Sequence, residues 1–121
     1  MSPVNYTIEN LQRYPDYVKD AIKKYSKFLN SLGLDHKALI NDLQNGVKTV
    51  VKEFNKGKYD IAEAAVGISN EICHVQSDIM RLCRLDLTQN ENDQLAELVE
   101  DINTELENLN TIAHHYRKYR R

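Results

Sequence analysis

The sequence predicts an all-α protein, an antiparallel up-down four-helix bundle preceded by a short N-terminal helical segment. Four stretches repeat apolar residues at alternating intervals of three and four positions, and short breaks with helix-capping or helix-ending residues separate them. A spacing that averages about 3.5 residues keeps one seam of each helix against its neighbours. The four seams are Val18, Ile22, Tyr25, Leu29 and Leu32; Ile40, Leu43, Val47, Val50 and Phe54; Ile61, Ala65, Ile68, Ile72, Val75, Ile79 and Leu82; and Leu95, Val99, Ile102, Leu106, Leu109, Ala113 and Tyr116.

The first long helix is expected over about residues 15–32, after an N-terminal arm of residues 1–14. Pro15 suits the first helical turn, where a backbone N–H has no partner in any case. Gly33 supplies the left-handed residue that commonly ends a helix. The arm contains enough apolar residues for one short amphipathic helix that packs against an end of the domain.

The second helix is expected over about residues 36–55, with Asp35 as its N-terminal cap. The pair Asn45-Gly46 often forms a turn, but the apolar spacing keeps its phase across it. We therefore expect one continuous helix with a weak point at this pair.

The third and fourth helices are expected over about residues 61–84 and 89–119. Each follows a pair of residues that resembles a capping box, in which two side chains bond each other's backbone N–H groups. The two pairs are Asp60 with Glu63, and Thr88 with Glu91.

The last helix is the longest, so its C-terminal end should extend beyond the others. In an up-down bundle this end lies beside Pro15, and we expect residues 4–14 to fold across it. The expected contacts join Ile8 and Leu11 to Leu109, Ala113 or Tyr116.

The composition fits a single domain over residues 1–121. A chain of this length with 41% hydrophobic residues can bury one core but not two. The formal net charge of −2 gives no overall field that would attract DNA, RNA or anionic lipid. Any binding of that kind has to be local.

Neither a membrane segment nor a disulfide is expected. No run of about 18 apolar residues occurs, and the N-terminus lacks the basic flank and apolar stretch of a signal peptide. Cys73 and Cys83 stand about 15 Å apart along one helix, too far for a disulfide, and their spacing matches no zinc pattern. We expect a cytoplasmic protein with reduced thiols, no metal, no cofactor and no membrane partner.

A second seam runs beside the main one on the third helix. Its members are Ala62, Val66, Ser69, Cys73, Gln76, Met80 and Cys83. These residues either complete the core of a helix that has neighbours on both sides, or leave a partly exposed strip. In the second case Val66, Cys73 and Met80 would bind another protein or a second copy of this chain, since methionine adapts well to binding surfaces.

Glu71 and His74 are spaced as in the Glu-x-x-His motif of di-iron and di-manganese carboxylate bundles. Such a site needs a second Glu-x-x-His motif, which the sequence lacks. Both residues also flank the main seam rather than occupy it. We therefore expect His74 on the surface or in an interface and no metal ligands.

The same residues resemble a motif of the MazG-like all-α nucleoside triphosphate pyrophosphohydrolases. In that family a Glu-x-x-Glu helix and a later Glu-x-x-Asp helix hold magnesium against the triphosphate. The corresponding positions here are Glu71 with His74, followed by Glu97 with Glu100, or a register that uses Asp101 and lacks its glutamate. The resemblance implies a degenerate member whose acids are remnants of a magnesium site, because magnesium prefers oxygen ligands to imidazole.

The C-terminus mixes cations with aromatic residues, a composition that grips phosphates and stacks on bases. Arg117, Lys118, Arg120 and Arg121 could therefore contact nucleic acid within a larger complex. Alternatively, these charges solvate the end of a helix and interact with its last carbonyl groups.

No catalytic or cofactor motif occurs in the chain, and a bundle with fully apolar seams leaves little room for a substrate pocket. The favoured hypothesis is a small non-catalytic protein that binds another protein, as an inhibitor, immunity or regulatory protein, or assembly subunit.

Overall fold

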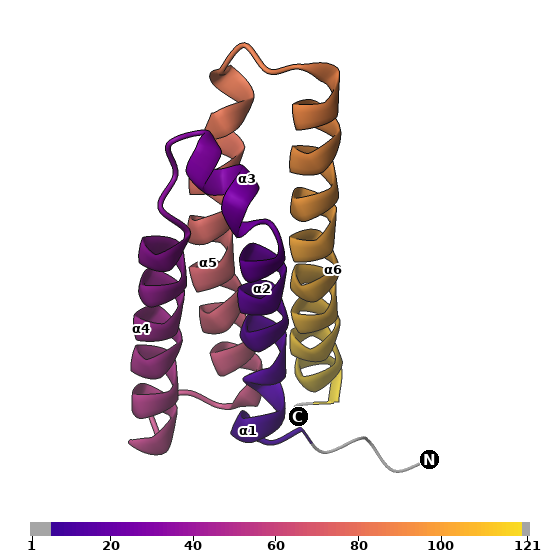
Figure 1. Ribbon diagram of the computed structural model, residues 1–121. Helices are drawn as coiled ribbons and strands as arrows, with labels where there is room; N and C mark the ends of the chain where they lie inside the picture. The colour runs from indigo at the N-terminus through magenta and orange to yellow at the C-terminus, as the bar shows by residue number, and fades with distance from the viewer. Residues whose placement is uncertain (1–5, 120–121) are drawn as a thin grey trace.

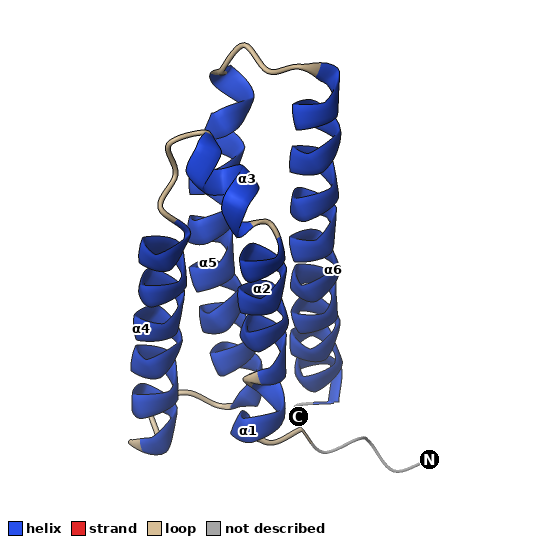
Figure 2. Cartoon of the chain, in the orientation of Figure 1, coloured by secondary structure: helices blue, strands red, loops and turns tan. Residues whose placement is uncertain are grey.

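The computed structural model describes residues 6–119, with side chains through residue 117. Every element within this range is helical, which confirms the all-α class (Figure 2). The elements are α1 (Ile8–Leu11), α2 (Arg13–Lys24), α3 (Ser26–Ser31), α4 (His36–Asn55), α5 (Ile61–Met80), the 3₁₀ helix η1 (Arg81–Arg84) and α6 (Gln89–Tyr119).

The four longer helices α2, α4, α5 and α6 lie side by side, and consecutive ones run in opposite directions (Figure 1). The α5 helix packs most extensively against α6 and then against α4. The α2 helix packs against α6 and, less extensively, against α4. Each long helix therefore has two main neighbours, and α2 and α5 occupy opposite corners.

The capping residues form the bonds that their sequence positions predict. The Asp35 carboxylate accepts from the N–H of Lys37 at 3.0 Å, and Asp60 and Glu63 bond each other's backbone N–H groups. Thr88 and Glu91 do the same at the start of α6. Each cap satisfies N–H groups that the helix leaves without an internal partner.

Two glycines allow α4 and α5 to approach each other closely. The α4 helix continues through Gly46, and a Cβ atom there would overlap the Glu71 side chain on α5. A Cβ atom on Gly67 would lie 3.2 Å from both methyl carbons of Val50 on α4. The Asn45-Gly46 pair therefore serves helix packing rather than a turn.

The sequence predicts one helix over residues 15–32, but in the structure this segment is divided at Tyr25 into α2 and α3. There the backbone leaves helical geometry, with φ −101° and ψ 18°, and α3 starts in a new direction. The consecutive residues Phe28 and Leu29 of α3 are both buried. Gly33 follows with φ 86°, as expected for the residue that ends this segment.

The core consists mainly of the seam residues. Among the fully buried side chains, Ile22, Leu43, Ile72 and Ile102 come one from each long helix. Burying a side chain of this size favours folding by about 1.5–3 kcal/mol. The predicted seams do not include Leu39, Leu98 and Ile112. These residues are also buried, and they widen the apolar stripes of α4 and α6.

The N-terminal arm lies at the C-terminal end of α6, the end that the helix lengths predict (Figure 1). The backbone N–H of Tyr6 donates to the hydroxyl of Tyr116, and the two rings meet edge to face with centroids 6.1 Å apart. Ile8 and Leu11 of α1 are buried, and α1 packs mainly against α2 and α5, so the expected contacts with Leu109, Ala113 or Tyr116 stay a prediction. The part of the expected arm at residues 1–5 lies outside the described residues.

Two substitutions on α5 test the orientation of this helix. Ile72 is fully buried, so Ile72→Ala should lower the free energy of unfolding by about 2–5 kcal/mol through lost burial and a residual cavity. His74 is exposed, so His74→Ala should change it by less than about 1 kcal/mol. Urea denaturation of both variants measures the difference. A larger loss for His74→Ala would contradict the packing of α5.

Candidate functional site

The second seam of α5 is divided into a buried and an exposed part. Ala62 and Ser69, 2% and 7% exposed, complete the core. Cys73 and Met80 lie on the surface, with Met80 47% exposed, while Val66 is half-buried at the edge of the core. The core interpretation thus holds for the first two residues, and the three residues of the expected binding strip reach solvent to different degrees.

Around this strip, one side of α5 forms a surface that we call the α5 outer face. It consists of Glu63, Val66, Asn70, Cys73, His74, Ser77, Met80 and, at the start of η1, Arg81. Intervals of three and four residues place these positions on one side of a helix. The α5 sequence contains no lysine or arginine. Glu63 and Arg81 carry charge at the two ends of the face, and Asp78 lies beside it in contact with Arg81.

Side chains beside this face reach both neighbouring helices. Toward α6, the Gln76 amide donates to the Asn103 side-chain oxygen at 2.7 Å and to the Val99 carbonyl at 3.4 Å. Toward α4, the half-buried Glu71 side chain lies over Gly46. These contacts hold the outer face between two closed helix seams, so it is presented as a rigid surface.

The possible magnesium residues do not come together in the structure. Glu71 faces α4, whereas His74 points outward on the α5 outer face. Glu97, on the exposed side of α6 next to α2, accepts a hydrogen bond from the Tyr25 hydroxyl at 2.9 Å. The two carboxylates thus belong to different edges of the molecule. Among the residues whose side chains are described, no three histidine, cysteine, aspartate or glutamate side chains gather as metal ligands would.

Glu97 and Glu100 instead line a shallow depression between α2 and α6, together with Lys24 and Tyr25. Burial of the Tyr25 ring, followed by its hydrogen bond to Glu97 and the nearby negative charge, raises the pKa of Tyr25 to about 12. The Lys24 ammonium lies 5.6 Å from the centre of the same ring. In this depression, the hydrogen bond from Tyr25 to Glu97 links the end of α2 to α6, which gives Glu97 a structural role.

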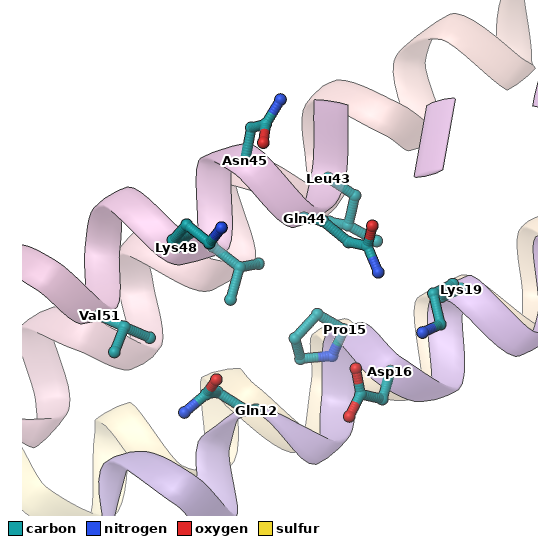
Figure 3. A pocket seen from close by; sticks show the side chains of 10 residues that line it. Gln12, Pro15, Asp16, Lys19, Leu43, Gln44, Asn45, Lys48 and Val51 are labelled. Carbon is teal, nitrogen blue, oxygen red and sulfur yellow. The ribbon is translucent and has the colours of Figure 1, made fainter. Parts of the chain in front are cut away.

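A groove between α2 and α4 was not indicated by the sequence (Figure 3). Its volume is about 390 Å³; Pro15 and Leu43 contribute to an apolar floor, and Asp16, Lys19 and Lys48 supply charges of both signs. In Figure 3, Pro15 points into the groove and Gln44 extends from α4 toward α2. The looser packing of α2 against α4 leaves this space open. Periodicity could not reveal it, because both helices have ordinary seams.

The structure places only part of the basic C-terminal patch. Arg117 is exposed near the end of α6. The side chain of Lys118, and Arg120 and Arg121, lie outside the described residues. Within residues 6–119, no helix combines the length and apolar composition needed to cross a membrane.

The bond between Tyr25 and Glu97 predicts a pH dependence of stability. The folded pKa of about 12 lies above the value of about 10 expected for an unfolded tyrosine. The neutral phenol therefore stabilises the fold fully below pH 10, and this contribution is lost as the pH rises toward 12. Urea denaturation between pH 9 and 12 should show that the free energy of unfolding of the wild type falls as the pH rises. The fall should be smaller in Tyr25→Phe.

A spectroscopic control separates Tyr25 from the other tyrosines. The difference in tyrosinate absorbance between the wild type and Tyr25→Phe should titrate near pH 12. In the Glu97→Gln background, the absorbance difference made by Tyr25→Phe should titrate at a lower pH than in the wild type, because the negative charge of Glu97 is gone. It should stay above pH 10, because burial of the ring, the largest cause of the raised pKa, remains. A wild-type difference that already titrates near pH 10 would contradict the buried bond.

Comparison with known proteins gives no relative from which a function could be transferred. No protein family, curated protein or solved structure shows a significant match to this chain. A function therefore has to be inferred from the surfaces of the chain itself, among them the α5 outer face with its exposed Met80.

Proposed function

We propose that this chain is an antiparallel up-down four-helix bundle that acts by binding another protein through the α5 outer face. It works without catalysis in the cytoplasm, as an inhibitor, immunity or regulatory protein, or assembly subunit. The observation that carries this proposal is the exposed, uncharged row of Cys73, Ser77 and Met80 on a helix without lysine or arginine.

The composition of the face is typical of the centre of a protein interface. Such centres are depleted of charged residues and enriched in methionine, whereas the rim stays polar. Met80 is exposed near one end of the face, and the charged side chains Glu63 and Arg81 stand at its two limits. By contrast, α6 exposes Glu97 and Glu100 to solvent along its length.

The geometry of α5 supports recognition by helix packing. The helix has 20 residues, so the face is about 30 Å long. Cys73, Ser77 and Asn70 are small, which lets a partner helix approach closely. Because α5 packs against α6 and α4 on its two sides, little conformational entropy is lost when a partner binds.

A matched pair of substitutions tests this function. Met80→Asp places a charge on the α5 outer face, and Tyr17→Asp places one on α2, at the opposite corner. The two side chains are 47% and 50% exposed, so both variants should keep a free energy of unfolding within about 1 kcal/mol of the wild type.

The measurement is affinity capture from the native cell extract with quantitative mass spectrometry. Proteins captured by the wild type should also be captured by Tyr17→Asp and lost with Met80→Asp, because a buried unpaired charge is unfavourable. Equal capture by Met80→Asp and the wild type would exclude the α5 outer face as the binding surface.

A further inference from the structure

We propose that the protein bound by the α5 outer face is a second copy of this chain, packed antiparallel about a two-fold axis that passes between the two α5 helices next to Cys73. This inference rests on the proposed function and specifies its partner. In such a pair, a residue that precedes Cys73 by a given number of positions meets the residue that follows Cys73 by the same number.

The charges at the two ends of the face complement each other under this symmetry. Glu63 lies ten positions before Cys73 and Arg81 eight positions after it, so each Glu63 faces Arg81 of the second copy to within one helical turn. Both side chains are exposed. Arg81 contacts Asp78 of its own chain at 3.5 Å, yet its side chain is 71% exposed, and a guanidinium has five N–H donors.

The apolar residues obey the same symmetry. Val66 and Met80 are each seven positions from Cys73, so Val66 of one copy lies opposite Met80 of the other. The symmetry produces this contact twice in the dimer. Between them, Asn70, Cys73 and Ser77 put small, uncharged side chains at the axis. Two helices with small residues at their crossing point can approach to the usual 8–10 Å between axes.

Charge also selects the antiparallel arrangement. A parallel pair would set Glu63 against Glu63 and Arg81 against Arg81, and like charges in contact oppose association. The exposed face of α6 is less suited to self-pairing, because Asp93, Glu97 and Glu100 would meet acids of the second copy. One helix face buries an area at the low end for specific interfaces, so the dimer should depend on protein concentration.

Single-cysteine variants test the position of the axis. Cys83→Ser leaves Cys73 at the axis, where the two thiols are close enough for a disulfide. Cys73→Ser leaves Cys83 about 15 Å from the axis, so its two copies stand roughly 30 Å apart. Both cysteines are exposed, which makes the second variant a matched control.

Oxidation by copper phenanthroline and oxygen should cross-link the Cys83→Ser protein about ten-fold faster than the Cys73→Ser protein, because the dimer raises the effective concentration of the Cys73 thiols. Equal rates for the two variants would overturn the proposed axis.

A charge exchange tests the pairing itself. Glu63→Lys and Arg81→Glu should each raise the dimer dissociation constant about ten-fold, since each places like charges together twice. The double variant should return it to near the wild-type value, because each end again meets the opposite charge. Sedimentation velocity over a concentration series measures the constant. If the double variant has a dimer dissociation constant as high as that of the weaker-binding single variant, the proposal is overturned.

Because Glu63 belongs to the capping box at Asp60, urea denaturation must accompany these measurements. Loss of the cap lowers stability in Glu63→Lys and in the double variant alike, so it cannot produce recovery of the dimer.

The inference and the proposed function fail in different ways. A protein that stays monomeric at all concentrations, while Met80→Asp still removes a captured protein, overturns the second copy as partner and leaves the proposed function standing. A dimer that Met80→Asp leaves unchanged, with capture also unchanged, overturns both.

Discussion

The close packing of α5 against α4 and α6 is the constraint on which the rest of the structure depends. Ile68, Ile72 and Ile79 of α5 are fully buried and face the other helices. A Cβ atom on Gly67 would crowd Val50 on α4, and the Glu71 side chain occupies the space over Gly46. Interiors are packed as densely as organic crystals, so this approach fixes both the distance and the rotation of α5.

The rotation of α5 decides which of its residues remain available for binding. With the isoleucines directed inward, Gln76 reaches α6 and Glu71 reaches α4, and the remaining positions form the outer face. The middle of this face has no charged side chain and so carries a small desolvation penalty when it is covered, whereas the acids exposed on α6 would each lose hydration. The same packing that builds the core thus leaves the outer face of α5 exposed to solvent.

The acidic residues show how tertiary structure separates side chains that a motif would group. Glu71 and Glu97 lie on the two helices with the most extensive contact, yet their side chains face away from each other. Glu97 accepts a hydrogen bond from the Tyr25 hydroxyl, and the Glu71 side chain fills the space over Gly46. Each carboxylate therefore has a local structural role that its spacing in the sequence does not reveal.

The sequence by itself determined the all-helical class, the range of α4 through Gly46, the capping bonds at Asp35, Asp60 and Thr88, and most of the core. These features follow from local geometry, because 3.6 residues per turn and unpaired N–H groups act within a single helix. Only the tertiary structure decided the break at Tyr25, the burial of Ser69 beside an exposed Cys73, and the groove between α2 and α4. Those depend on where a helix bends and how closely it meets its neighbours, and periodicity along one helix carries no information about either.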